Sequence, residues 1–209
     1  MGVKFEQELN RFVFDFEHDG NNDIIELTGS GYEVTAFSHC FYYGYEFSNE
    51  IDGSLRSAFI KFVKFTSNLQ ENPDITRFIR KAIDDLNKKI NIYDYDLVVM
   101  PESSSKVNQY MMRYIYRFAQ PMLRQMELVK SLPSNISFDM DGKEVFANEK
   151  DELLCKTIRQ QNVLVIDDIA TSGSTLNEVL RALRLLNEDN KITIFSLIGR
   201  KDLTIDSMD

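Results

Sequence analysis

Cysteine is almost absent from this chain of 209 residues, which contains only Cys40 and Cys155. The two lie far apart and form no metal-ligand spacing, so we expect neither a cysteine metal site nor a structural disulfide. This usage is typical of proteins of the reducing cytoplasm. Long apolar runs are missing too, so no membrane span is expected. Residues 1–10 are mixed and polar, unlike a secretory signal peptide.

Positive charge is also in short supply. The chain has 24 Lys and Arg against 33 Asp and Glu, which gives a formal net charge of −9. Such a balance disfavours nucleic acids and anionic membranes as partners, because phosphate-rich surfaces would be repelled. A small anionic ligand that binds together with a divalent cation remains compatible, since the local site decides its affinity.

What is present fits one globular unit. Hydrophobic residues make up 43% of the chain, enough for a sizeable core, and the length suits a single domain. Residues 12–16 and 24–27 are predicted as strands around an Asp19-Gly20 turn. Further strands are expected at 32–37 and 41–47, so the first fifty residues resemble a short β-meander. Residues 1–52 are therefore predicted as a β-rich N-terminal part, separate from a core at 53–209.

Helical spacing follows the predicted strands. One helix is marked by Leu55, Phe59, Phe62 and Val63. Another, started by Asn72-Pro73, is marked by Ile75, Phe78, Ile79, Ala82, Ile83 and Leu86.

From residue 96 onward, short apolar runs alternate with amphipathic helices. Strands are predicted at 97–100, 128–129, 163–166 and 192–198, with a long helix over 107–118. This order predicts an α/β fold with a mostly parallel central sheet and helices on both faces. Ligands of such sheets bind at the carboxyl ends of the strands.

The most informative stretch is residues 163–175, Val-Leu-Val-Ile-Asp-Asp-Ile-Ala-Thr-Ser-Gly-Ser-Thr. A buried strand ends in two acids, a loop of small and hydroxyl residues follows, and an amphipathic helix begins at Ser174 or Thr175. Such a loop directs backbone N–H groups and the positive end of a helix toward its ligand, which favours a phosphate. The plain alternative is an ordinary capped turn with two solvated acids.

All thirteen positions resemble the 5-phosphoribosyl-1-pyrophosphate (PRPP) motif of type I phosphoribosyltransferases. The resemblance implies that Asp167 and Asp168 hold the ribose 2′- and 3′-hydroxyls and are the catalytic acids. It assigns the 5′-phosphate to Ala170, Thr171, Ser172, Gly173, Ser174 and Thr175. The family's fold agrees with the predicted sheet.

A second loop follows the strand at 97–100. In the family, the corresponding loop binds pyrophosphate, which implies that role for Ser103, Ser104, Ser105 and Lys106. Hydroxyls, consecutive amides and an ammonium group suit a polyanion. Many relatives have Gly or Arg here, and Glu102 is an unusual neighbour for pyrophosphate. The alternative is an exposed turn with a capping serine.

Other residues carry weaker expectations. The polar segment 131–156 is a candidate lid in which Lys143 and Lys150 reach pyrophosphate, or else a solvated hairpin. His18 and His39 fall in the predicted meander and are interpreted as surface or core histidines. In purine-handling relatives a lysine near Lys201 touches the base, but a solvated strand end explains it equally well.

The resemblance implies transfer of a phosphoribosyl group from PRPP to an unidentified nitrogenous acceptor, with release of pyrophosphate. Mg²⁺ would bind through PRPP and water near Asp167 and Asp168, without direct protein ligands. Thr171 replaces the aspartate of 6-oxopurine enzymes, as in the orotate-type and competence-associated groups. Residues 1–52 are a candidate hood over the acceptor, and a cytoplasmic homodimer is expected. The alternatives are a PRPP- or nucleotide-sensing regulator and a partner-binding protein on the same fold.

Overall fold

The structure of the chain is a computed structural model that describes residues 2–9, 11–28, 33–36, 39–46, 53–65, 73–101, 105–118, 124–128, 162–170, 173, 175–177, 179–180, 183 and 189–199. Its helices and short 3-10 turn are α1 (Gly53–Phe65), α2 (Pro73–Lys89), η1 (Ile92–Asp94) and α3 (Lys106–Phe118). Its strands are β1 (Gly2–Glu6), β2 (Arg11–His18), β3 (Asn21–Thr28), β4 (Glu33–Ala36), β5 (His39–Glu46), β6 (Leu97–Pro101), β7 (Arg124–Leu128), β8 (Asn162–Ile169) and β9 (Lys191–Gly199).

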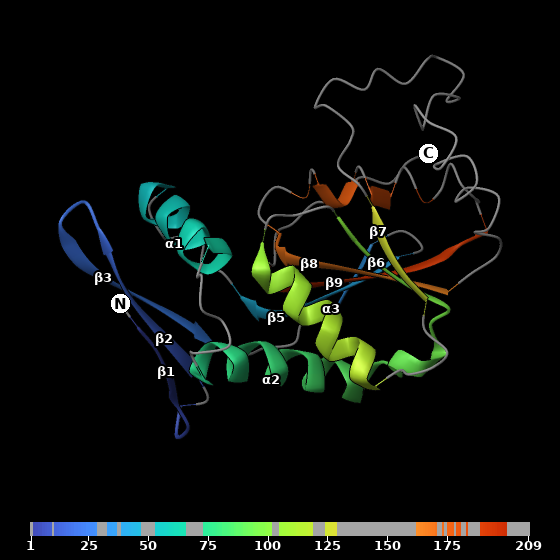
Figure 1. Cartoon of the computed structure of the whole chain (residues 1–209), viewed down its shortest axis with the longest axis horizontal. Helices are drawn as coiled ribbons and strands as arrows, with labels where there is room; N and C mark the ends of the chain where they lie inside the picture. The colour runs from blue at the N-terminus through green and yellow to red at the C-terminus, as the bar shows by residue number, and fades with distance from the viewer. Residues whose placement is uncertain are drawn as a thin grey trace, which may run out of the picture.

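A six-stranded sheet forms the centre of the molecule (Figure 1). Its strand order is β4-β5-β9-β8-β6-β7. All neighbours are parallel except β4, which pairs antiparallel with β5 at one edge. The predicted α/β fold with a mostly parallel sheet is confirmed.

Helices cover both faces of this sheet, as predicted. On one face, α2 and α3 bury apolar residues against Val98, Leu164 and Leu197. On the other, the helical residues Leu176, Val179, Leu180 and Leu183 pack with Val99, Val165 and Ile194. The strands therefore read as continuous apolar runs, because a parallel sheet between two helical layers is buried on both sides.

Residues 1–52 are β-rich as expected, but they divide between two sheets. β5 lies inside the large sheet and pairs with β9, whereas β1, β2 and β3 form a separate three-stranded sheet. The meander is therefore shorter than expected. The physical reason is burial on both faces: Tyr43 packs in one apolar layer and Tyr45 in the other. The predicted role of residues 1–52 as a hood stays a prediction.

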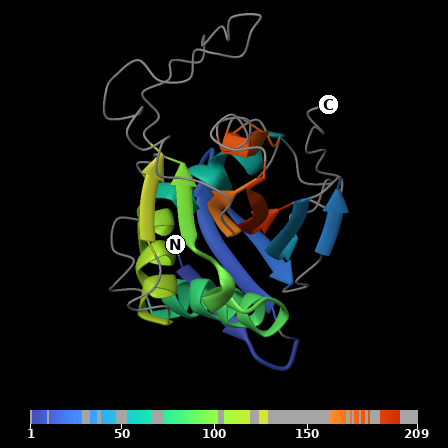
Figure 2. The ribbon, with the colours of Figure 1, turned by 90° about the vertical axis from the view of Figure 1, so that its right-hand side faces the viewer.

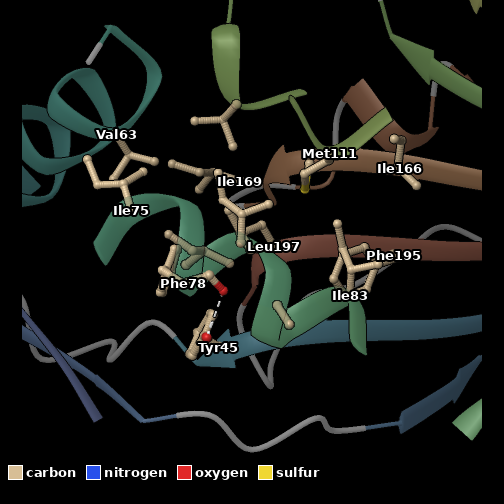
Figure 3. Packing of buried hydrophobic residues seen from close by; sticks show 14 of the residues in the cluster. Tyr45, Val63, Ile75, Phe78, Ile83, Met111, Ile166, Ile169, Phe195 and Leu197 are labelled. Atoms are coloured by element: carbon tan, nitrogen blue, oxygen red, sulfur yellow. Dashed lines mark hydrogen bonds between the residues drawn. The ribbon is translucent and has the colours of Figure 1, made fainter. Parts of the chain in front are cut away.

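Close packing holds β5 against α2. A Cβ built on Gly44 would lie 2.6 Å from the Ala82 Cβ, so only glycine allows this approach. Nearby, the Tyr45 hydroxyl donates to the Phe78 carbonyl at 2.9 Å (Figure 3). Burial raises the pKa of Tyr45, with a further contribution from Asp85, so the phenol stays protonated and keeps this bond.

The N-terminal sheet is antiparallel and packs its aromatic face on the helices. The turn between β2 and β3, at Asp19 and Gly20, has positive φ at both residues (51° and 78°), the backbone that a two-residue hairpin requires. Phe12, Phe14 and Phe16 are buried, and Phe14 lies edge-on to both Phe59 of α1 and Phe78 of α2. β1 was not expected, because the sequence alternation was clear only from residue 12.

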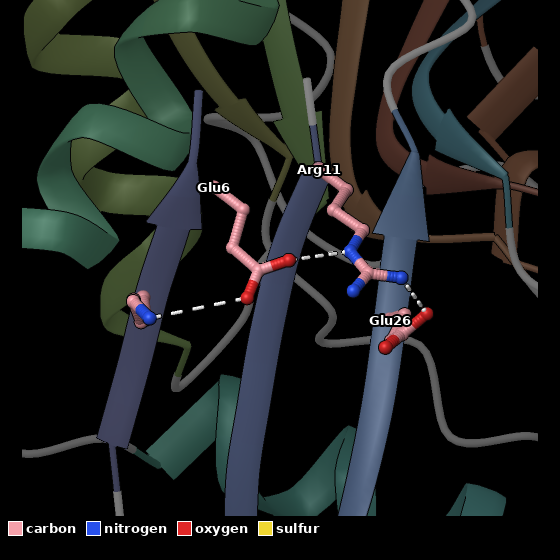
Figure 4. A network of polar contacts seen from close by, with 4 residues as sticks. Glu6, Arg11 and Glu26 are labelled. Atoms are coloured by element: carbon pink, nitrogen blue, oxygen red, sulfur yellow. Dashed lines mark hydrogen bonds and ion pairs between the residues drawn. The ribbon is translucent and has the colours of Figure 1, made fainter. Parts of the chain in front are cut away.

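Charged residues line the outer side of the N-terminal sheet (Figure 4). Arg11 of β2 donates to Glu6 of β1 at 2.7 Å and also pairs with Glu26 of β3. These cross-strand pairs alternate with the buried phenylalanines, so the two faces of this sheet differ as in many half-exposed antiparallel sheets.

Helix prediction was accurate and edge-strand prediction was not. The six buried residues of α2 are those marked by the apolar spacing. β7, expected at 128–129, ends at Leu128 instead and begins at Arg124. This edge strand has the sequence Arg-Gln-Met-Glu-Leu, whose polar residues obscure its periodicity. Among the described residues, no helix is long and apolar enough to cross a membrane.

Candidate active site

The candidate site lies at the topological switch point of the central sheet, between β6 and β8, where the order of successive strands changes direction. From β6 the next strand, β7, lies on one side, whereas from β8 the next strand, β9, lies on the other. The chain leaves β6 toward α3 on one face and leaves β8 toward the helical residues 175–183 on the opposite face. Ligands of open α/β sheets bind in the crevice at the carboxyl ends of two such strands. Both predicted loops begin there, and in Figure 2 the arrowheads of β6 and β7 point toward helical residues 175–183.

Two buried acids end β8. Asp167 is 6% exposed and Asp168 is fully buried. Asp167 Oδ1 accepts the Asp168 backbone N–H at 2.9 Å, and Asp168 Oδ1 accepts the Ile169 N–H at 2.7 Å. Since an ionised carboxylate is rarely buried without such donors, these contacts make the acids part of an organised strand end.

A turn with a left-handed glycine follows the acids. The Ala170 N–H donates to the Ile198 carbonyl at 2.9 Å, which ties the start of the loop to β9. Gly173 has φ of 77° and is buried. Its carbonyl accepts the Asn177 N–H at 2.8 Å, which closes the first turn of the helix that includes Thr175. The predicted strand and helix start are therefore in place. Of the loop between them the structure describes Ala170 and Gly173, and Thr171, Ser172 and Ser174 lie outside the described residues.

The loop after β6 also leads directly into a helix. Ser105 is 1% exposed and its carbonyl accepts the Gln109 N–H at 3.5 Å, so it stands at the start of α3. Lys106, the first residue of α3, is exposed. An exposed ammonium at the N-terminus of a helix suits an anion. Ser103 and Ser104 lie outside the described residues.

Asn108 of α3 connects the segment after β6 with the acids of β8. This residue was not singled out from the sequence. Its Nδ2 donates to Asp167 Oδ1 at 3.3 Å, although 59 positions separate them. The side chain is fully buried. It precedes Met111, Met112 and Ile115 by three, four and seven positions, so it occupies the apolar stripe of α3. A polar residue in such a stripe was the available signal.

Oxygen donors for a divalent cation are present but sparse. The carboxylates of Asp167 and Asp168 are the type of ligand that Mg²⁺ accepts. Within the described ranges, no group of three or more His, Cys, Asp or Glu residues could hold a metal ion. A Mg²⁺ ion near these two acids stays a prediction.

The remaining candidate residues either lie away from this site or lie outside the described residues. His39 begins β5, at the amino end of this parallel strand and thus opposite the candidate site. His18 ends β2 beside the hairpin turn. Lys143, Lys150 and Lys201 and the candidate lid at 131–156 lie outside the described residues.

A known protein family matches the second half of the chain. Residues 111–206 match the family model of the phosphoribosyl transferase domain. This part of the chain, which is a little under half of its length, is thus similar to phosphoribosyl transferase domains. The match includes Asp167, Asp168 and the loop after them, and it begins beyond Ser103–Lys106.

Solved structures also match. One is a hypoxanthine phosphoribosyltransferase from Staphylococcus aureus, which is 15% identical, with a TM-score of 0.40 over 65% of this chain and 68% of that chain. No curated protein matches the sequence significantly.

Proposed function

We propose that the chain transfers a phosphoribosyl group from PRPP to a nitrogenous acceptor and releases pyrophosphate. The observation that carries the proposal is the contact between Asn108 and Asp167, which brings the start of α3 against the acids of β8. A ligand at this strand end would meet both loops at once. PRPP has the matching layout, with a phosphate, two ribose hydroxyls and a pyrophosphate on one small scaffold.

Each group has a proposed role. Asp167 and Asp168 hold the ribose hydroxyls, because carboxylates are strong acceptors for hydroxyl donors. Residues 170–175 bind the 5′-phosphate at the helix start. Residues 103–106 bind the pyrophosphate, and the Lys106 ammonium balances part of its charge. Mg²⁺, bound through PRPP oxygens and water near the two acids, would stabilise the leaving pyrophosphate.

The chemistry is a displacement at ribose C1. A bond forms between the acceptor nitrogen and C1, the C1–O bond to pyrophosphate breaks, and the acceptor nitrogen loses a proton. Positive charge grows on the ribose ring as this happens, and the carboxylates of Asp167 and Asp168 stabilise that charge electrostatically. No covalent nucleophile from the protein is required.

The acceptor is a nitrogenous base other than hypoxanthine or guanine. This choice is supported by Thr171, which stands where 6-oxopurine enzymes carry an aspartate. Residues 1–52 are the proposed hood over the acceptor. The likeness to orotate-type and competence-associated enzymes, the homodimer and the cytoplasmic location stay predictions. Neither the family match nor the geometry favours a non-catalytic regulator.

The test is release of pyrophosphate when the protein is mixed with PRPP, Mg²⁺ and each of a panel of bases. We expect release with one base class, and loss of release in Asp168→Asn. The control is Asp189→Asn, which removes one charge at an exposed position before β9. Binding of PRPP without release for any base would overturn the transferase proposal and leave the regulator.

A further inference from the structure

The side-chain amide of Asn108 is energetically unfavourable where it lies. It is fully buried, and its Oδ1 has no hydrogen-bond partner among the described residues. A buried acceptor without a donor costs about 1–3 kcal/mol. The neighbouring inward positions of α3 are Met111, Met112 and Ile115, so an apolar side chain would suit the stripe better.

The other end of the amide accounts for this arrangement. Nδ2 donates to Asp167 Oδ1, which also accepts the Asp168 backbone N–H. A carboxylate accepts and does not donate when ionised, so it fixes the amide with its NH₂ group toward β8. The same orientation leaves Oδ1 buried and without a hydrogen-bond partner among the described residues. The unfavourable placement of one atom thus follows from the favourable placement of the other.

We propose that Asn108 is a positioning residue that sets the orientation of the Asp167 carboxylate for ribose hydroxyls. The inference rests on the proposed function. Two donors, from Asn108 and from Asp168, meet at one oxygen and restrict rotation of the carboxylate. A ligand hydroxyl then meets an acceptor that is already oriented, which lowers the entropy lost on binding. Because Asn108 lies two residues after Lys106, it also links this acceptor to the pyrophosphate loop.

The experiment compares two ligands by calorimetry. Ribose 5-phosphate contains the hydroxyls that Asp167 would hold, and inorganic phosphate does not. In Asn108→Leu, of similar volume, ribose 5-phosphate should bind roughly tenfold more weakly, the size of a hydrogen bond to a charged group. Inorganic phosphate should bind as before. Asn108→Asp, of the same shape, should lose more, because two carboxylates would face each other.

A double-mutant cycle separates positioning from a general structural role. In an Asp167→Asn protein, Asn108→Leu should cause little further loss of ribose 5-phosphate affinity, because the two changes act on one interaction. The matched control is Asn190→Leu. Asn190, the residue before β9, is also a buried asparagine. Its side chain donates to the Leu183 carbonyl, and the hydrogen bond is 3.0 Å long. Its replacement should leave ligand affinity unchanged.

The outcomes are distinct. If the unsubstituted protein binds ribose 5-phosphate no better than inorganic phosphate, the proposed function fails, and the role of Asn108 fails with it. If it prefers ribose 5-phosphate and Asn108→Leu keeps that preference, only the positioning role is overturned. If neither variant folds, the Asn108 side-chain NMR signals of the unsubstituted protein decide. They should shift with ribose 5-phosphate and not with inorganic phosphate, and signals unchanged by both overturn the proposal.

Discussion

The units that follow β6 and β8 are alike in plan and different in construction. Each is a buried strand, a short loop and the start of a helix, at neighbouring positions of one sheet edge. After β8, the acids and the glycine are buried and bonded to backbone groups. After β6, the charged group is an exposed lysine at a helix start.

The difference teaches which unit defines the ligand. Groups fixed by the fold before the ligand arrives discriminate strongly, because little entropy is lost when they bind. An exposed side chain such as Lys106 contributes less, since it must be ordered and is screened by solvent. The loop and helix start after β8 should therefore contribute most of the affinity for PRPP, and those after β6 should contribute less.

Gly173→Val should give the largest loss. The φ of 77° is strained for a β-branched residue, and the added side chain would fill the phosphate approach. We expect ribose 5-phosphate affinity to fall about a hundredfold or more, as when two charged hydrogen bonds of about 1.5–3 kcal/mol each are lost. Calorimetry measures it.

The control for this variant is Gly20→Val. Gly20 has almost the same φ, 78°, with open space around it in the N-terminal hairpin. It should be destabilised by a similar strain and still bind ligand normally. Normal binding by Gly173→Val would mean that the phosphate cradle lies elsewhere.

Asp168→Ala should follow in size. It removes a carboxylate proposed to hold ribose, a contact worth about 1.5–3 kcal/mol, or roughly ten- to a hundredfold in affinity. Calorimetric titration with PRPP and Mg²⁺ measures the change, and Asp189→Ala serves as the charge-matched control. Equal affinity in Asp168→Ala and the unsubstituted protein would remove the ribose role from this residue.

Lys106→Ala should give the smallest and most selective effect. PRPP and free pyrophosphate should weaken roughly tenfold, at the low end for a contact with a charged oxygen. Ribose 5-phosphate should change little, because it lacks pyrophosphate. Lys191→Ala, an exposed lysine at the opposite end of β9, controls for net charge. An equal loss of affinity for all three ligands would indicate a general electrostatic effect of the lysine charge. Unchanged affinity for all of them would mean that residues 103–106 only cap the helix.

Much of this architecture could be predicted from local patterns. The buried set of α2 and the apolar runs of β6, β8 and β9 are direct consequences of burial, and the structure confirms them. The place of β5 could not be predicted in this way, because its parallel partner β9 is supplied by distant sequence. Strand pairing of that kind depends on the packing of the whole sheet.

The site shows the same division between local and distant information. Asp167, Asp168 and Gly173 follow one another in a continuous motif, so sequence alone placed them together. Their proposed ligand roles stay predictions. Asn108 contacts Asp167 only because α3 packs against β8, and its neighbours in the sequence do not reveal that contact.

The pairing of β5 with β9 has a consequence for folding during synthesis on the ribosome. β5 ends at Glu46, and β9 ends at Gly199. Translation at about 5–20 residues per second therefore separates the two strands by on the order of ten seconds. Until β9 emerges, the aromatic strand lacks its parallel neighbour and presents an unpaired edge, the kind of surface that joins strands of other chains. We therefore expect nascent chains that stall before residue 191 to be especially dependent on chaperones.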